Sequence, residues 1–304
     1  MEKSSPFGAG DGLFYGSLRL NIWYQNDGNN LQSSILIKVP QLGRLFSSRK
    51  SRLYLHNSTE EYMYSIILPL MSIGDWSQEK LWPNFYNSTE SGVLIMENLY
   101  ESGFSPVKDY PHDLGKWTEV FKSLAQFHAL SVVTNVNDGN DWSNTNVENA
   151  IAWDELVLIA GKFQLHVLPL LSGNVVMRLW NVFNNLDNVL KSGHSSNVDG
   201  LNVILHGDPN FMNVFFHGGN DDSIFLKSKF INFHMSRRGS PVIDLMHYVM
   251  TSVHPEVFMA EYHALLLFYV DEFRITVEEW NGIDDQKKYS LADLLADLQK
   301  YRSY

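Results

Sequence analysis

The sequence predicts an α+β fold in which a small β-rich N-terminal lobe precedes a larger, mainly helical lobe. Two observations favour this order. Apolar and polar residues alternate over Ser17–Tyr24, which is typical of a half-buried strand, and a second, apolar segment, ILIKV, ends at Pro40. After residue 114 apolar residues instead recur at the three- to four-residue spacing of one helix face. We therefore predict two lobes, 1–98 and 99–304, joined by a hinge at Glu97–Glu101.

In the N-terminal lobe we expect three strands, each an apolar segment close to turn-forming residues: Ser17–Tyr24, Ser34–Val39 and Val93–Met96. A helix is expected between the second and third strands, over Ser58–Met71. Its first turn holds Glu60 and Glu61, where the helix dipole favours carboxylates.

The C-terminal lobe is predicted to be mainly helical. The expected helices are Leu114–Val133, Glu148–Leu171, Val175–Leu190, Pro241–Val253, Glu256–Phe273 and Leu291–Tyr301. Three short strands are expected between them: Asn202–Leu205, Val214–Phe216 and Lys229–Phe233. The apolar stripes of 148–192 and 256–304 fit either a packed core or an acceptor pocket, so the sequence does not name a substrate.

Composition limits the partners that the chain can have. The formal net charge is −11 and the pI is near 5.4, so phosphate-rich nucleic acids and anionic membranes would be repelled. The sequence has no cysteine, which excludes disulfides, thiolate nucleophiles and cysteine-zinc sites. It contains no apolar run long enough to span a membrane and no apolar signal segment at its start. We expect no nucleic acid, no membrane insertion and a cytoplasmic location.

The strongest motif is His206-Gly207-Asp208, with Asn213 five positions after the aspartate. Phosphoryl transfer to a hydroxyl needs a carboxylate near the attacking oxygen and an oxygen ligand for the Mg²⁺ that bridges the phosphates. Kinases supply both from one loop with this spacing, between two apolar strands. We predict Asp208 as the base and Asn213 as a metal ligand. The alternative is that His206 and Asp208 only stabilise a turn.

A lysine and three glycines suggest where a nucleotide would bind. Lys38 lies in the apolar segment ILIKV, where a buried ammonium would need a partner. In kinases such a lysine contacts the nucleotide phosphates and is held by a helix glutamate, here Glu60 or, second, Glu61. The alternatives are an edge-strand lysine in water and a glutamate that only suits the helix dipole. The glycines at 8, 10 and 12 precede the first strand and suit either a phosphate loop or a flexible end.

The segment after the third C-terminal strand departs from the kinase pattern. Kinases place a second metal-binding aspartate before a phenylalanine there, whereas this chain has Asn232-Phe233. Asparagine offers one neutral oxygen in place of a carboxylate, so we expect Asn232 to be a weakened metal ligand. Asp244 either supports the catalytic loop or merely solvates a helix end. His128 is expected to be a core histidine with its hydrogen bonds satisfied.

These segments together resemble the insect ecdysteroid 22-kinase-like family, also called CHK-kinase-like, in the choline kinase and aminoglycoside phosphotransferase branch of the kinase-like fold. The most specific stretches are LHGDPNFMNVFF and INFHMSRRGSPVIDLMHYVMTS. The resemblance implies a two-lobed protein-kinase-like fold, ATP and Mg²⁺ as cofactors, and the hydroxyl of a small molecule, such as a steroid, as the acceptor. The residues matching the family's functional positions are Asp208 as the base, Asn213 and Asn232 for the metal, Lys38 with Glu60, Gly10 and Gly12 for the phosphates, and Glu97 and Leu99 at the adenine.

Three departures from the family pattern leave activity open. The family usually has an aspartate where this chain has Asn232, a tryptophan where it has Asn210 and a serine where it has Tyr15. The sequence therefore leaves three functional hypotheses. The first is an ATP-dependent phosphotransferase, and the second is a pseudokinase that binds nucleotide or sterol without turnover. The third is a scaffold that retains only the fold.

Overall fold

The fold described below is that of a computed structural model of the chain. The structure describes these residues: 15–26, 29–40, 59–72, 80–107, 114–134, 177, 200–218, 226–281 and 289–301. Several predictions concern residues outside these ranges: Gly10 and Gly12, the helix 148–171 and, apart from Met177, the helix 175–190.

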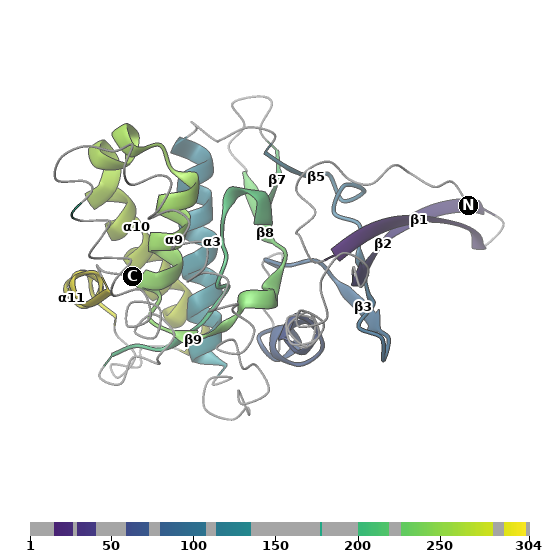
Figure 1. Ribbon diagram of the computed structural model, residues 1–304, viewed down its shortest axis with the longest axis horizontal. Helices are drawn as coiled ribbons and strands as arrows, with labels where there is room; N and C mark the ends of the chain where they lie inside the picture. Colours follow the sequence, from purple (N-terminus) through teal and green to yellow (C-terminus); the bar gives the residue numbers. More distant parts are fainter. Residues whose placement is uncertain are drawn as a thin grey trace.

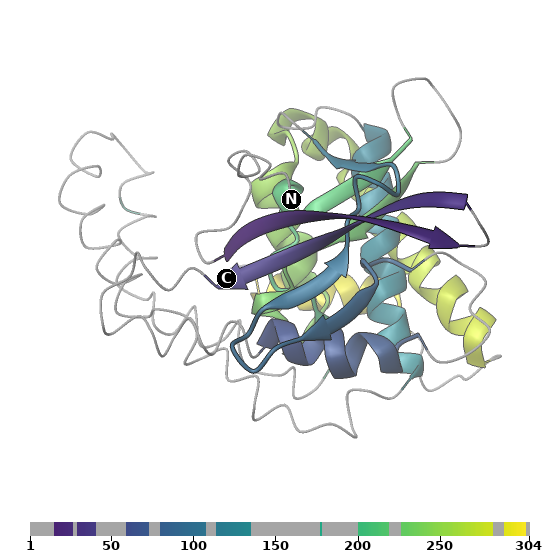
Figure 2. The same cartoon turned by 90° about the vertical axis from the view of Figure 1, so that its right-hand side faces the viewer.

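The N-terminal lobe is built on a four-stranded antiparallel sheet of order β1-β2-β4-β3. Its strands are β1 Tyr15–Asn26, β2 Asn29–Pro40, β3 Phe85–Ser88 and β4 Leu94–Glu97. The three expected strands are confirmed, and β3 was not expected. The long hairpin of β1 and β2 extends away from the helical lobe (Figure 1) and crosses in front of it when viewed from its own side (Figure 2). Strand β2 lies inside the sheet, which makes Lys38 a central-strand residue.

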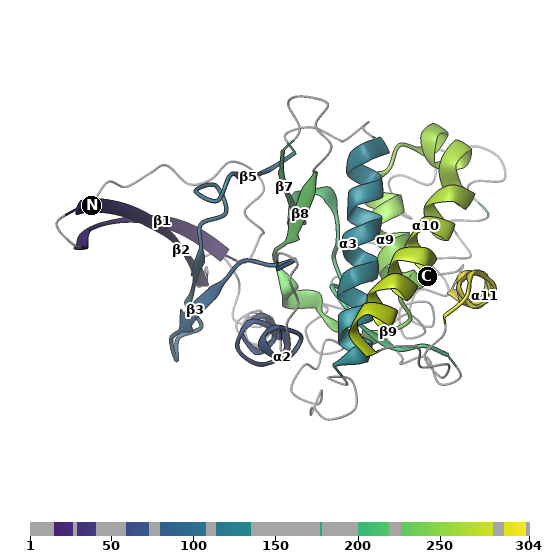
Figure 3. The same ribbon diagram turned by 180° about the vertical axis from the view of Figure 1, so that it is seen from behind.

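The expected helix after β2 is present from Thr59 to Leu70 but is not a regular α-helix. A π-helical turn, η2 (Met63–Ile67), precedes the short α2 (Leu68–Leu70), which lies beside β3 in Figure 3. The buried side chains of this segment, Tyr64 among them, face the core. Tyr64 stacks on Phe85 of β3, with ring centroids 5.7 Å apart, and this contact fixes the helix against the sheet.

Four helices form the C-terminal lobe within the described residues: α3 Leu114–Val133, α9 Val242–Ser252, α10 Pro255–Asn281 and α11 Leu291–Tyr301. Helix α3 lies between β7–β8 and the helices α9 and α10 (Figure 1). This position explains why α3 is buried almost all round from Trp117 onward, as a helix at the centre of a core must be. Helix α10 continues past its expected end at Phe273. No helix among the described residues has the length and apolar character needed to cross a membrane.

Two small antiparallel sheets belong to the C-terminal lobe. One has the order β5-β7-β8, formed by Phe104–Pro106, Val214–His217 and Lys227–Phe230. The other pairs β6 (Val203–Leu205) with β9 (Arg237–Gly239). The prediction of a strand from Lys229 to Phe233 is wrong at its end. Strand β8 stops at Phe230 because Asn232 adopts a left-handed conformation, with φ 67° and ψ 54°, and a 3-10 turn follows over Phe233–Met235.

Candidate active site

The loop that follows β6, beginning at His206, is bonded to the first turn of α9. Asp244 accepts hydrogen bonds from the backbone N–H groups of His206 at 2.7 Å and of Gly207 at 3.0 Å. Its side chain is fully buried, so these donors and a charged or polar partner must stabilise the carboxylate. Of the two alternatives for Asp244, the structure supports direct bonding to the loop of His206 and Gly207.

The partner of Asp244 is His128 on α3. His128 Nε2 lies 3.2 Å from Asp244 Oδ2, and Nδ1 lies 2.8 Å from the hydroxyl of Tyr269. Burial alone would raise the pKa of the Asp244 carboxyl, but the hydrogen bond and charge of His128, with smaller contributions from His206 and Arg237, hold that pKa below its ordinary value. His128 is thus a core histidine with both ring nitrogens bonded, as predicted.

His206 joins the loop to the segment before Asn232. Its Nε2 lies 2.8 Å from the carbonyl oxygen of Ile231, and its Nδ1 accepts from the backbone N–H of Asp208 at 3.2 Å. A carbonyl oxygen only accepts, so the proton must be on Nε2. Burial lowers the pKa of His206 further than the nearby carboxylates raise it. His206 is therefore a neutral structural residue that sets the conformation of the loop.

Gly207 lets the loop pass close to the segment after β8. Its φ is +88°, and a Cβ at this position would collide with the carbonyl oxygen of Met235. We expect Gly207→Ala to lower the free energy of unfolding by more than the roughly 1–3 kcal/mol of left-handed backbone strain alone.

A matched control for Gly207→Ala is Gly92→Ala, because Gly92 has a φ of +77° in the turn between β3 and β4. Urea denaturation of both variants separates the backbone cost from the collision. Equal losses in the two variants would show that the contact with Met235 is not tight.

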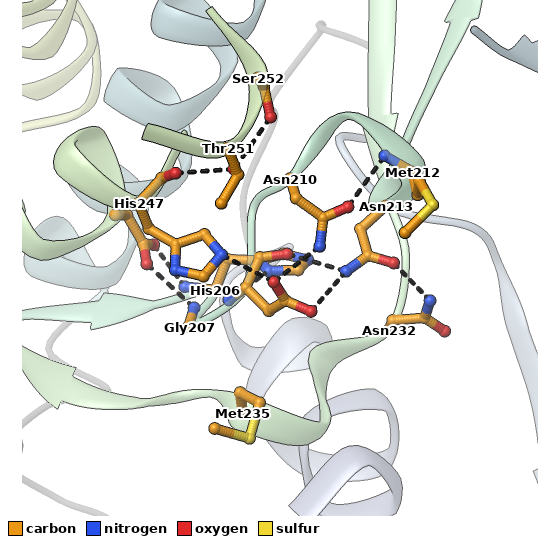
Figure 4. Close-up of polar contacts among 12 residues, drawn as sticks. His206, Gly207, Asn210, Met212, Asn213, Asn232, Met235, His247, Thr251 and Ser252 are labelled. Atoms are coloured by element: carbon orange, nitrogen blue, oxygen red, sulfur yellow. Dashed lines mark hydrogen bonds and ion pairs between the residues drawn. The ribbon is translucent and has the colours of Figure 1, made fainter. Parts of the chain in front are cut away.

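Three side chains that Figure 4 labels, Asn210, Asn213 and His247, surround the carboxylate of Asp208. Its Oδ1 accepts from Asn210 Nδ2 at 2.7 Å and lies 2.8 Å from His247 Nε2, and its Oδ2 accepts from Asn213 Nδ2 at 2.9 Å. Burial would raise the pKa of Asp208, but the bond and charge of His247, with the bond from Asn210, lower it below its ordinary value. Asp208 is therefore a carboxylate at neutral pH, as a base must be.

Sequence reasoning did not identify His247 as part of this group. His247 lies three residues after Asp244 on α9, so the two side chains emerge from neighbouring turns of one helix. The three-residue spacing could have identified His247, because a helix that brings Asp244 to the loop also brings His247 close to it. Asn210 was noted only as a departure from the family, yet its side-chain oxygen also caps the 3-10 turn Phe211–Asn213.

Lys38 reaches this loop from the other lobe. Its Nζ lies 2.7 and 2.8 Å from the two carboxylate oxygens of Glu60 and 2.6 Å from Asn232 Oδ1. Lys38 is 7% exposed and Glu60 is 0% exposed, so the pair is buried. Both alternatives, a lysine in water and a glutamate that only suits the helix dipole, are wrong.

Asn232 connects Lys38 to the loop that contains Asp208 and Asn213. Its Nδ2 donates to Asn213 Oδ1 at 2.5 Å, as Figure 4 shows. Phe233, the next residue, packs between the rings of Tyr64 and His206, at centroid distances of 5.5 and 4.7 Å. This packing fixes Asn232 at the point where the two lobes meet. Lys38, Glu60, Asn232, Asn213 and Asp208 thus form one continuous set of contacts.

The family assignment comes from comparison of the whole sequence. The sequence pattern of the ecdysteroid kinase-like family matches residues 10–282, which is most of the chain. The chain belongs to the ecdysteroid kinase-like family. None of the curated proteins compared with it matches. The membership confirms the predicted resemblance, and the arrangement of strands and helices confirms the two-lobed kinase-like fold.

Solved structures of similar architecture include three kinds of protein. A choline/ethanolamine kinase family protein from Mesorhizobium loti aligns over 99% of this chain and 91% of its own, at 12% identity and a TM-score of 0.39. A streptomycin–ATP–APH(2'')-IIa ternary complex aligns over 99% and 91%, at 14% identity and 0.41. A microcompartment-associated aminopropanol kinase aligns over 95% and 86%, at 11% identity and 0.40.

The two predicted metal ligands of this ecdysteroid kinase-like protein do not fit a Mg²⁺ ion as they are arranged. Mg²⁺ binds hard oxygens in near-octahedral geometry. Asn232 Oδ1 already accepts from Lys38, and Asn213 Oδ1 already accepts from Asn232. Among the residues that the structure describes, no group of three or more histidine, cysteine or acidic side chains could hold a metal ion.

The hinge residues of the ecdysteroid kinase-like chain are engaged with the protein itself. The Glu97 carboxylate accepts from the backbone N–H of Asn84 at 2.9 Å and lies 3.6 Å from Lys229 Nζ. The side chain of Leu99 is buried, and its carbonyl accepts from the Phe104 N–H at 2.9 Å. These contacts hold the hinge in place. A role of Glu97 and Leu99 at the adenine ring stays a prediction.

Proposed function

We propose that this ecdysteroid kinase-like protein transfers the γ-phosphoryl group of ATP to a hydroxyl of a small molecule, with a steroid or similarly lipophilic alcohol as the acceptor. The observation that supports this most is the unbroken series of hydrogen bonds that leads from Lys38 to Asp208. Through Asn232 and Asn213, three hydrogen bonds of 2.6, 2.5 and 2.9 Å link the proposed phosphate-binding cation to the proposed base. Positioning of this kind supplies most of the catalysis in phosphoryl transfer.

Asp208 takes the role of base in this proposal. Its lowered pKa keeps it ionised, and the bonds from His247, Asn210 and Asn213 hold its orientation. The acceptor hydroxyl gives its proton to a carboxylate oxygen of Asp208 while its oxygen bonds to the γ-phosphorus. The bond between the γ-phosphorus and the bridging oxygen breaks, and ADP leaves.

The nucleotide is assigned to the N-terminal lobe, 1–98. Lys38, held by Glu60, would contact the phosphates, and Gly10 and Gly12 would cover them. The adenine would lie at the hinge against Glu97 and Leu99, next to the boundary with the lobe 99–304. The pairing of Lys38 with Glu60 supports this assignment, because kinases hold the phosphate-contacting lysine with a helix glutamate in the same way.

A second candidate function is nucleotide binding without turnover. Asn232 favours it, because the position that carries a metal-binding carboxylate in kinases here holds a neutral amide whose oxygen is bonded to Lys38. Loss of charged metal ligands removes stabilisation of the developing charge on the phosphoryl group. The two candidates share the nucleotide site and differ only in the chemical step.

Incubation of the full chain with ATP and a panel of sterols and small polar alcohols tests the proposal. We expect ADP to form with an acceptor and a phosphorylated product to be detected by mass spectrometry. Matched analogues that lack the hydroxyl serve as the control and should give no product. A rise in melting temperature with ATP but no product supports the second candidate, and no response to ATP at all contradicts both.

A further inference from the structure

The orientations of the Asn232 and Asn213 amides are fixed by groups that allow only one assignment. The Lys38 ammonium can only donate, so the atom of Asn232 at 2.6 Å from Nζ must be its oxygen. The Asn232 nitrogen then faces Asn213. At the other end, Asn213 Nδ2 faces the carbonyl and carboxylate oxygens of Asp208, at 2.8 and 2.9 Å, which can only accept. Reversing either amide would oppose two donors or two acceptors.

In this arrangement the side-chain N–H of Asn232 points at Asn213 Oδ1. With an aspartate at position 232, a cation would be needed at the same place. An aspartate at 232 would keep one oxygen on Lys38 and turn the other toward Asn213 Oδ1, at the 2.5 Å now spanned by the amide. Two oxygens that face each other at this distance repel unless a positive charge lies beside them. The Asn232 amide supplies the partial positive charge from its own N–H.

We propose that the side-chain amide of Asn232 takes the place of a divalent cation. The site between Asn213 and Asn232 therefore binds no Mg²⁺, and the protein binds a nucleotide without a divalent ion. The nucleotide part rests on the proposed function, whereas the absence of a cation site depends only on the contacts above. The left-handed backbone of residue 232 suits asparagine and aspartate alike. Asn232→Asp should therefore restore the cation site without straining the chain.

The first test uses Mn²⁺ alone, with no nucleotide, followed by electron paramagnetic resonance. We expect no saturable binding to the natural chain and saturable binding to Asn232→Asp, with a Kd at least about tenfold below the highest Mn²⁺ concentration used. Asn202→Asp adds the same charge immediately before β6, at the opposite end of that strand from the loop of Asp208, and should not gain binding. Saturable Mn²⁺ binding to the natural chain, or no gain in a folded Asn232→Asp, overturns the proposal.

The second test measures ATP affinity by calorimetry, once with MgCl₂ and once with EDTA. The natural chain should bind ATP with similar affinity in both, and Asn232→Asp should lose at least about tenfold in EDTA. A tenfold loss for the natural chain in EDTA contradicts metal-free binding. If neither protein binds ATP, the proposed function fails together with the nucleotide part of the proposal, while the Mn²⁺ result alone decides whether Asn232 replaces a cation.

Discussion

Replacing Lys38 by methionine is expected to lower the free energy of unfolding by about 3–5 kcal/mol. The reason is that Glu60 is 0% exposed and Lys38 Nζ bonds both of its carboxylate oxygens. Methionine has a similar length but no charge, so the carboxylate would be left buried with no counter-ion. Asn232 Oδ1 would lose its donor as well. Urea denaturation at neutral pH measures the loss.

A double-mutant cycle distinguishes the ion pair from the packing of the lysine stem. Glu60→Gln removes the charge that methionine would leave unpaired, so Lys38→Met with Glu60→Gln should cost less than the sum of the two single changes. Arg274→Met is the control in an exposed pair, because Arg274 lies 3.7 Å from Asp271 with both side chains about half exposed. It should cost only about 0–1 kcal/mol. If Lys38→Met costs no more than Arg274→Met, the pair is not buried in solution.

The loop around Asp208 could be predicted because the residues that define it lie close together in the sequence. His206, Asp208 and Asn213 have a fixed spacing between two apolar strands, and short strands place neighbouring residues reliably. Lys38 and Glu60 could be paired because a lysine in an apolar strand requires a partner and the next helix offers one early in its first turns. These inferences needed no knowledge of tertiary structure.

The remaining features depend on contacts that no local pattern contains. The left-handed conformation of Asn232 arises where Phe233 packs between Tyr64 and His206, residues far apart in the sequence. This conformation ends β8 early and directs the Asn232 side chain toward Lys38. The sequence had suggested a metal ligand at this position instead. The π-helical turn after Glu60 and the three-residue strand β9 are similarly set by packing and pairing rather than by propensity.

Substituting asparagine for Asp208 is expected to lower acceptor-dependent ATP turnover by about 10²–10⁴-fold, the usual contribution of a general base. The amide cannot take the proton of the hydroxyl. Its NH₂ group must also face a donor, either Asn213 on one side or Asn210 and His247 on the other. ATP affinity should change little, because Asp208 acts on the acceptor rather than the nucleotide. Steady-state kinetics with a calorimetric measurement of ATP binding separate the two effects.

The pH dependence of turnover tests the same role through His247. Turnover requires Asp208 ionised, so it should fall as pH drops through the pKa of Asp208, which lies below its ordinary value of 3.8. His247→Phe removes the hydrogen bond and charge that lower this pKa but leaves the carboxylate in place. The acidic limb of the pH–rate profile should therefore move to higher pH in His247→Phe. A limb that stays in place, together with an Asp208→Asn variant that keeps near-normal turnover, would show that Asp208 is not the base.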